Sequence, residues 1–248
     1  MLNIVIPMAG KGSRFQEAGY AFPKPLIDIH GKTMIEIVIK NLTPKTDHKF
    51  IFICQKEHYE KYDLHNIFKN TTKNNFEVIQ INGITEGAAC TVLCAKKYIN
   101  DENPLLIANS DQYIEADINS FIDKSSNQGV DGNIMTFESS HPKWSYVRLN
   151  SDKLVLETAE KKVISNEATV GIYYFKEGKD FVEGAENMIK KNIKSNNEFY
   201  VCPVYNELIL KHKKITTDKI QVSKIHGLGT PEDLNKFIKK LDEKDIVL

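Results

Sequence analysis

Short apolar runs alternate with helix-like stretches over the first 110 residues of the chain. Continuous apolar runs of this length are typical of parallel strands that are covered on both faces. The runs occupy residues 2–7, 49–54, 76–81 and 104–109. Because strands and helices alternate, the pattern predicts right-handed crossovers and a doubly wound sheet.

Two of the intervening stretches have the apolar spacing of helices. Over residues 33–42 the apolar side chains share one helical face, and Thr33 and Glu36 at its start have the spacing of a capping box. Over residues 87–98 the apolar side chains again recur on one face. We expect a helix over each stretch.

The rhythm changes after Asp117, where strand-like runs follow one another with turn signals between them and few helices. Strands are expected at residues 132–138, 145–149, 153–159 and 168–175, and helices near 180–191, 201–211 and 231–241. No stretch rich in Pro, Gly or Ser divides the chain. The sequence therefore predicts an α/β fold with a Rossmann-like, doubly wound, mixed sheet. We expect one domain, 1–248, with two halves, 1–117 and 118–248.

Composition narrows the class of protein. The 248 residues include 33 Lys and Arg against 33 Asp and Glu, so the formal net charge is zero. A neutral chain lacks a bulk electrostatic grip on nucleic acid or an anionic membrane, so a local site must hold any anionic ligand. No apolar run approaches the roughly 18 residues that span a bilayer, and the start lacks the basic region of a signal peptide. We expect a cytoplasmic protein with neither nucleic-acid nor membrane partners; a homo-oligomer is possible.

Neither the cysteines nor the histidines have the spacing of a metal site. The cysteines are Cys54, Cys90, Cys94 and Cys202. We expect them to be buried, reduced thiols. The seven histidines are dispersed along the chain.

A glycine-rich turn follows the first apolar run. It consists of Met8, Ala9, Gly10, Lys11, Gly12, Ser13 and Arg14. Glycines let backbone N–H groups approach phosphate oxygens, and the two cations add charge. The dinucleotide-binding pattern G-x-G-x-x-G fails, because Phe15 stands at its third glycine. The turn therefore predicts a polyphosphate site of another kind.

A lysine between two prolines follows this turn. Pro23 and Pro25 restrict the backbone on both sides of Lys24, which suits that side chain to meet a reacting phosphate. A P-loop over residues 30–33 fails, because Leu26 stands where that motif requires a glycine. We therefore expect the turn and Lys24 to converge on one polyphosphate.

These motifs resemble those of the nucleotidyltransferases that make nucleoside-diphosphate sugars and related activated metabolites. The resemblance rests on residues 9–15 and 22–36 and extends more loosely over most of the chain. It implies the glycosyltransferase-A-like fold of nucleotide-diphospho-sugar transferases. It also implies an enzyme that joins a nucleoside triphosphate to a small phosphorylated acceptor, uses Mg²⁺ and releases pyrophosphate.

The resemblance also assigns residues to the nucleotide, which it places in the 1–117 half. The residues it implies as nucleotide contacts are Met8, Ala9, Gly10, Lys11, Gly12, Ser13, Arg14, Glu86, Gly87, Ala88 and Ser110. Asp111, at the end of the fourth apolar run, matches the Mg²⁺ ligand. Lys24 matches the lysine between the α-phosphate and the acceptor phosphate. Arg14, Lys24 and Asp111 are thus the expected catalytic residues.

The 118–248 half is expected to bind the acceptor. The implied acceptor contacts are Lys24, Ser145, Glu160, Lys161, Gly171 and Tyr200. Two departures from the family pattern matter here. Gly227 stands where sugar-nucleotide-forming members often carry a second metal aspartate, so a second ligand comes from elsewhere, from water, or not at all. The stretch 144–147 is bulkier than the family's glycine-containing one, which argues against a hexose acceptor.

Within that family the chain most resembles capsule-locus cytidylyltransferases that activate phosphoglutamine. This implies CTP, phosphoglutamine and a role in capsular polysaccharide modification. One alternative is a sugar-1-phosphate nucleotidyltransferase using dTTP, UTP or GTP. Another is a nucleotide-sugar glycosyltransferase, which would usually have a D-x-D pair where this chain has Asp111, Gln112 and Tyr113. A third is a non-catalytic nucleotide-binding subunit, a reading that Gly227 favours.

Overall fold

The computed structural model describes residues 1–246 and 248. The strands are β1 (Leu2–Pro7), β2 (Asp28–Ile29), β3 (Lys32–Thr33), β4 (His48–Gln55), β5 (Phe76–Ile81), β6 (Leu105–Ala108), β7 (Gln112–Ile114), β8 (Gly132–Glu138), β9 (Ser145–Leu149), β10 (Val155–Glu160), β11 (Glu167–Phe175), β12 (Ile215–Lys219) and β13 (Ile225–Gly227). The helices are α1 (Ser13–Glu17), α2 (Met34–Leu42), α3 (Lys56–Lys61), α4 (Leu64–Thr71), α5 (Ala88–Leu93), α6 (Lys96–Ile99), α7 (Ile118–Asn127), α8 (Gly178–Lys190), α9 (Val204–Ile209) and α10 (Pro231–Asp242), with 3-10 turns η1 (Lys24–Leu26) and η2 (Val222–Lys224).

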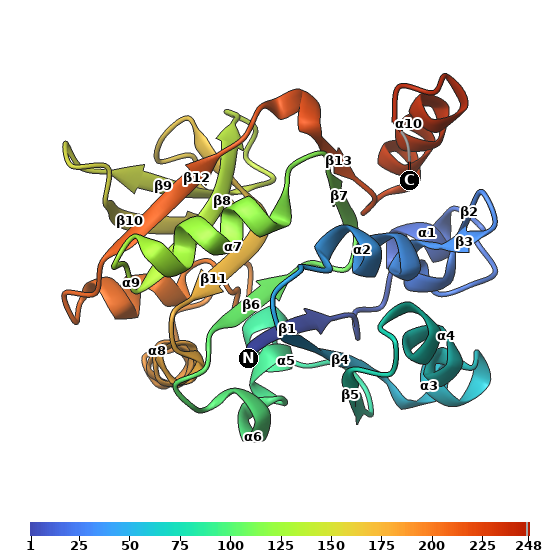
Figure 1. The fold of residues 1–248 in the computed structure, drawn as a ribbon, viewed down its shortest axis with the longest axis horizontal. Helices are drawn as coiled ribbons and strands as arrows, with labels where there is room; N and C mark the ends of the chain where they lie inside the picture. The colour runs from blue at the N-terminus through green and yellow to red at the C-terminus, as the bar shows by residue number, and fades with distance from the viewer. Residues whose placement is uncertain (247) are drawn as a thin grey trace.

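One mixed sheet runs through the molecule (Figure 1). Its order is β10-β9-β11-β6-β1-β4-β5, and β8 pairs with β11 and β12. Strand β1 is parallel to both β4 and β6, whereas β11 is antiparallel to β6. This arrangement confirms the predicted α/β fold with a mixed, doubly wound sheet.

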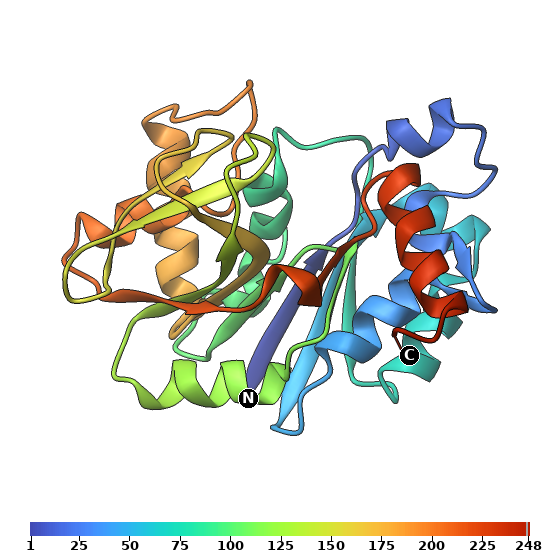
Figure 2. The same ribbon diagram turned by 90° about the horizontal axis from the view of Figure 1, so that it is seen from above.

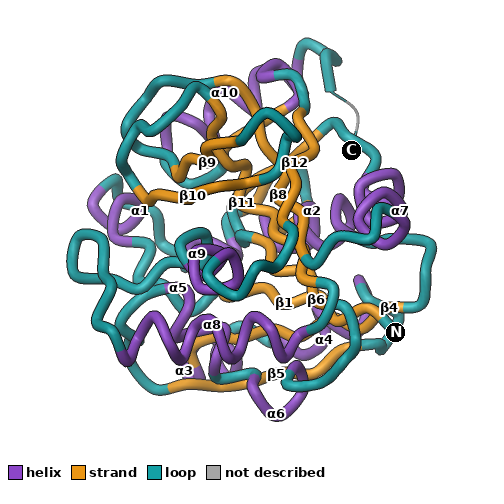
Figure 3. The backbone as a smooth tube through the Cα atoms, turned by 90° about the vertical axis from the view of Figure 1, so that its left-hand side faces the viewer, coloured by secondary structure: helices purple, strands orange, loops and turns teal. Residues whose placement is uncertain are grey.

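Alternate residues of the central strands face two separate cores. In β1, Ile4 and Ile6 pack in a core that includes α2, α7 and α10, whereas Val5 packs on the other face with α5, α8 and α9. Figure 3 shows α5 and α8 apart from α2 and α7, with the central strands between them. Both faces are therefore covered, which explains why the parallel strands read as continuous apolar runs.

The strand order reverses at β1. The chain passes from β1 to β4 and β5 on one side and then returns to β6 on the other side of β1. In open α/β sheets, ligands bind outside the carboxyl ends of the strands at such a switch point. The glycine-rich turn after β1 and Asp111 after β6 both lie there.

Helix α2 begins with the predicted capping box. The Glu36 backbone N–H donates to Thr33 Oγ1, and the Thr33 backbone N–H donates to Glu36 Oε2 at 2.7 Å. The helix expected over 87–98 is interrupted, because Ala95 leaves helical geometry at φ −86° and ψ 6° between α5 and α6. Helices α3, α4 and α7 and the short strands were not predicted.

The last part of the chain crosses back over the sheet. After β12, the segment through β13 leads to α10, which lies beside the N-terminal helices in Figure 2. His30 Nε2, at the β2–β3 turn, lies 3.1 Å from Asp242 Oδ1 of α10. This return places the end of the chain next to its beginning.

The cysteine prediction is only partly right. Cys54 and Cys202 are buried and Cys90 is half-buried, but Cys94 is exposed because it lies beyond the end of α5. All four are free thiols. Among the described residues, no helix is long and apolar enough to cross a bilayer.

Candidate active site

A cleft of about 630 Å³ opens at the switch point and extends into the second half of the chain. Six predicted nucleotide contacts line it: Met8, Gly10, Gly12, Arg14, Ala88 and Ser110. The predicted acceptor contacts that line it are Lys24, Ser145, Glu160, Lys161, Gly171 and Tyr200. Asp111 lies between the two sets. The structure thus brings most of the predicted site residues into one cleft.

The glycine-rich turn packs directly against the proline-flanked lysine. Gly12 caps α1 in the left-handed region at φ 63°, and a Cβ atom built on it would lie 3.4 Å from Lys24 Cβ. Lys24 begins η1, and Pro23 holds an extended backbone immediately before it. Two residues twelve positions apart in the chain, Gly12 and Lys24, therefore meet at one edge of the cleft.

Lys24 and Asp111 form an ion pair across the cleft floor. Lys24 Nζ donates to Asp111 Oδ2 at 2.7 Å, and the two side chains are 21% and 27% exposed. Burial alone would raise the pKa of Asp111, but the charges of Lys24 and Arg14 outweigh it and hold that pKa below its usual value. Asp111 is therefore a carboxylate at neutral pH, and its charge is shared between two cations.

The backbone around Asp111 is fixed by a strand pair from the end of the chain. Strand β13 pairs with β7, so that Gly227 lies opposite Gln112. The backbone N–H of Leu228 donates to the Asp111 carbonyl at 2.8 Å. A Cβ atom at Gly229 would lie only 2.7 Å from Asp111 Oδ2, so a glycine is needed there to make room for the carboxylate.

The acceptor half of the cleft contains a hydrogen-bonded set of polar side chains. Lys161 Nζ donates to the Tyr200 hydroxyl at 2.6 Å, and that hydroxyl donates to Glu198. Ser145 donates to Glu160, whose pKa is nevertheless raised because the carboxyl is buried. Lys161 holds a left-handed backbone at φ 52°, which is strained for a residue with a side chain. The structure thus gathers two carboxylates and a cation at this end.

Gly171 is needed for close approach at the cleft floor. Its φ is +95°, and a Cβ atom there would lie 2.2 Å from Asn109 Nδ2 and 2.8 Å from Gln112 Oε1. Gln112 is 6% exposed, and its Nε2 has no hydrogen-bond partner in the described part of the chain. The sequence reasoning did not assign Gln112 or Glu198 to the site, because neither belongs to a recognisable motif.

Some predicted residues lie outside the cleft lining. They are Ala9, Lys11, Ser13, Glu86 and Gly87. Ala9 is buried and its carbonyl accepts from Gln55 Nε2, and Glu86 forms an ion pair with Lys194. Gly87 packs against the Phe199 backbone and caps α5. Their proposed contacts with the nucleotide stay predictions.

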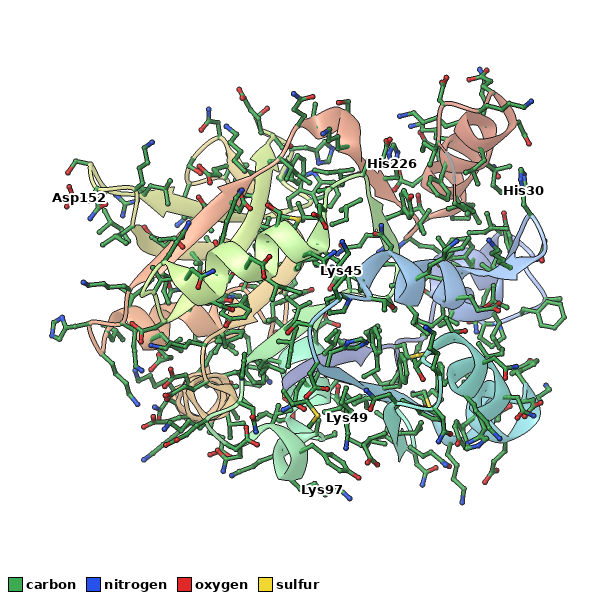
Figure 4. The ribbon with its side chains drawn as sticks, viewed as in Figure 1. His30, Lys45, Lys49, Lys97, Asp152 and His226 are labelled. Atoms are coloured by element: carbon green, nitrogen blue, oxygen red, sulfur yellow. The ribbon has the colours of Figure 1, made fainter. Side chains whose placement is uncertain are left out.

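Only some of the large side chains of residues 144–147 line the cleft. Trp144 and Ser145 line it, but the Tyr146 side chain is buried in the core and donates to the His141 carbonyl at 2.8 Å. Two of the histidines, His30 and His226, are labelled in Figure 4: His30 lies at the β2–β3 turn and His226 in β13. His226 is buried against Glu115, and burial lowers its pKa.

Asp111 is the carboxylate of the cleft that lies beside the glycine-rich turn and Lys24, where it could hold a metal ion. No three His, Cys, Asp or Glu side chains converge on one point among the described residues. Mg²⁺ is commonly bound through one or two carboxylates together with water and substrate phosphates, rather than by an all-protein cage. Asp111, at the end of the cleft that the glycine-rich turn lines and with space preserved by Gly229, fits such a site.

Comparison with known proteins supports this description. The family model described as "Nucleotidyl transferase" matches residues 4–219. The chain is 27% identical over 250 residues to "Bifunctional protein GlmU" of Methanocaldococcus jannaschii, an alignment that covers 98% of this chain and 55% of that protein. The chain spans about half the length of the curated relatives it matches.

Solved structures share the whole fold. A nucleoside-diphosphate-sugar pyrophosphorylase from Vibrio cholerae superposes with a TM-score of 0.83 at 27% identity, over 95% of this chain and 99% of that one. The inositol-1-phosphate CTP transferase from T. maritima has a TM-score of 0.76 at 14% identity, over 98% of this chain and 95% of that one. At that identity the second likeness shows the fold alone.

Proposed function

Because the chain belongs to the nucleotidyl transferase family, we propose that it transfers a nucleotidyl group from a nucleoside triphosphate to the phosphate of a small acceptor and releases pyrophosphate. The observation that carries this proposal is the convergence of the glycine-rich turn, Lys24 and Asp111 at one end of a single cleft. A triphosphate has negative charge for the turn and Lys24 to meet, and a divalent cation would offset the repulsion between it and the Asp111 carboxylate. The rest of the cleft leaves room for a second substrate.

The chemistry needs positioning more than proton transfer. An oxygen of the acceptor phosphate attacks the α-phosphorus, the bond from that phosphorus to the bridging oxygen breaks, and pyrophosphate leaves with the electron pair. The attacking phosphate is already anionic near neutral pH, so no general base is required. The protein's task is to hold two anions together and offset their repulsion.

Each cation has a distinct place in this scheme. Lys24, held by its flanking prolines, lies between the turn and the acceptor half, where it can contact the α-phosphate and the acceptor phosphate. Arg14 lies on the turn, where it can hold the departing pyrophosphate. Asp111 would hold Mg²⁺, which when bound neutralises phosphate charge. Lys24 must then exchange Asp111 for phosphate oxygens.

For the substrates, we propose CTP and an amino-acid-derived phosphate such as phosphoglutamine. The acceptor end of the cleft offers the carboxylates of Glu160 and Glu198 and the ammonium group of Lys161. Such a set of both signs complements a zwitterion, which presents an ammonium and a carboxylate together. A role in capsular polysaccharide modification would follow from this acceptor. The choice of CTP rests on the family resemblance.

A sugar 1-phosphate is the second candidate acceptor. The Tyr146 side chain is buried away from the cleft, which removes part of the steric argument against a hexose. The V. cholerae protein of the same fold is named for nucleoside-diphosphate sugars. With this acceptor the nucleotide would be dTTP, UTP or GTP.

A pyrophosphate-release screen tests these proposals. Four nucleoside triphosphates are combined with phosphoglutamine, sugar 1-phosphates and polyol phosphates in the presence of MgCl₂. We expect release with CTP and phosphoglutamine. Release with a sugar 1-phosphate instead would replace that acceptor, and nucleotide binding without release for any acceptor would favour a non-catalytic subunit. Transfer of sugar from a nucleotide sugar would favour a glycosyltransferase.

A further inference from the structure

We propose that Asp233 supplies a second carboxylate to the divalent-cation site at Asp111. This inference rests on the proposed function, because it concerns the metal that would accompany the triphosphate. Asp233 lies in the first turn of α10 and lines the same cleft as Asp111, 122 positions earlier in the chain.

Two glycines of one short segment, Gly227 and Gly229, lie next to the carboxylates of Asp233 and Asp111. A Cβ atom at Gly229 would lie 2.7 Å from Asp111 Oδ2, and one at Gly227 would lie 3.5 Å from Asp233 Oδ2. Leu228 between them is fully buried, and both glycines line the cleft, so both face it. Asp111 and Asp233 therefore border the same side of residues 227–229.

The local structure orients Asp233 toward this segment. The Asp233 backbone N–H donates to the Thr230 side chain at 3.1 Å, which fixes the start of α10. The neighbouring Glu232 is exposed and pairs with Lys236 at 2.6 Å, on the solvent side of the helix. Adjacent acids on one helix thus have different surroundings, and only Asp233 lines the cleft.

A buried amide in the same cleft is also consistent with a bound oxygen-rich ligand. Gln112 follows Asp111 directly, and its Nε2 is buried without a hydrogen-bond partner in the described part of the chain. A buried donor without a partner costs free energy unless an oxygen atom approaches it. Mg²⁺ prefers oxygen ligands and usually retains water and phosphate oxygens alongside one or two carboxylates. Asp111 and Asp233 match that number of carboxylates.

The arrangement also explains how Gly227 is compatible with a metal site. The Asp233 carboxylate lies where a short acidic side chain at position 227 would extend, because its Oδ2 and Cγ lie 3.5 Å and 3.6 Å from the Cβ position there. These are ordinary contact distances, so position 227 tolerates a Cβ atom, and a longer side chain there has room once Asp233 is shortened. The same space can therefore receive a carboxylate from either position.

Calorimetric titration of CTP into the full chain, with EDTA or with MgCl₂, tests the role of Asp233 without measuring turnover. In the unchanged chain we expect MgCl₂ to tighten CTP binding. Asp233→Asn should weaken this metal-dependent gain by about 10- to 100-fold, the range seen when groups around metal sites are changed. Affinity in EDTA should hold or rise, since a negative charge is removed near the phosphates.

Two further variants make the result specific. Glu232→Gln removes the same charge one residue away and should keep the full MgCl₂ effect. Gly227→Asp combined with Asp233→Ala should restore it, because alanine vacates the space and the carboxylate returns to it. If MgCl₂ tightened CTP binding to Asp233→Asn as much as to the unchanged chain, the assignment of Asp233 would be overturned and the proposed function would stand. No binding of any nucleoside triphosphate by the unchanged chain would instead contradict the proposed function.

Discussion

At the scale of single residues, Lys24 and Arg14 have roles that their charge alone does not explain. Lys24 is held against the glycine-rich turn and paired with Asp111, whereas Lys11 on the same turn is exposed and outside the cleft lining. Three cations within one short stretch of sequence are therefore not equivalent in the fold.

Removing Lys24 or Arg14 should abolish most turnover without unfolding the protein. Lys24→Ala and Arg14→Ala are each expected to lower kcat by about 10²- to 10³-fold, the cost of removing one group that stabilises transition-state charge. Lys11→Ala should cost less than about tenfold, because Lys11 does not line the cleft. Pyrophosphate release measures the rate, and circular dichroism checks the fold. Near-normal release by Lys24→Ala would show that Lys24 is not catalytic.

The ion pair between Lys24 and Asp111 should also affect stability in a pH-dependent way. The lowered pKa of Asp111 means that its ionised form stabilises the fold above the pKa of the unfolded chain, and that this contribution is lost as pH falls through the folded value. Lys24→Met leaves a half-buried carboxylate beside Arg14 alone, so its pKa should rise.

Urea unfolding at pH 7 and pH 4.5 measures this effect. We expect Lys24→Met to be less stable than the unchanged chain at pH 7, with a smaller difference at pH 4.5, where the carboxyl of the variant begins to protonate. Lys69→Met, on the exposed face of α4, should differ from the unchanged chain by the same small amount at both pH values. A gap that widens on acidification would contradict the assigned direction of the shift.

At the scale of elements, the pattern of apolar residues predicted the parallel strands, because β1, β4 and β6 are largely buried and β5 is half-buried. Strands β1, β4, β5 and β6 were located to within about a residue at each end. Short pairs such as β7 with β13 have three residues each and no usable period. They form because distant segments meet, and such pairing is not encoded in local spacing.

Helix α2 offers a test of an element that the sequence did predict. Thr33→Ala removes the side-chain acceptor for the Glu36 N–H and the hydroxyl that donates to Glu36 Oε2. Loss of such a cap costs about 0.5–2 kcal/mol in free energy of unfolding. Thr33→Ser keeps both bonds and should stay close to the unchanged chain in urea unfolding. Equal losses in both variants would point to the methyl group instead of the cap.

At the scale of the whole molecule, the cleft is lined by residues from both halves of the chain. The glycine-rich turn, Lys24 and Asp111 come from the parallel half, and Ser145, Glu160 and Tyr200 come from the mixed half. The sequence predicted these two sets because each lies in or near a motif. It did not predict Glu198 or the approach of Asp233 to Gly227, because those depend on how the chain returns through β13 to α10.

This division predicts that the two ends of the cleft can be altered separately. Glu198→Gln and Tyr200→Phe weaken the hydrogen bonds around Lys161, at the end away from the glycine-rich turn. These bonds hold Lys161 in place, so without them its contact with a charged group of the acceptor is weakened. Losing such a contact costs about 1.5–3 kcal/mol, so the KM for the acceptor should rise by as much as about ten- to a hundredfold. The KM for the nucleoside triphosphate should stay unchanged.

Steady-state kinetics with each substrate varied in turn separates these effects, and Arg14→Lys is the matched variant at the other end. Arg14→Lys should raise the KM for the triphosphate and leave that for the acceptor unchanged, because lysine cannot hold two phosphate oxygens as arginine does. If the Glu198 and Tyr200 variants changed both KM values equally, the mixed half would shape the whole cleft, and the division into two binding regions would be wrong. If each set of variants changed only the KM of its own substrate, one continuous sheet would support two separate binding surfaces that meet at Lys24 and Asp111.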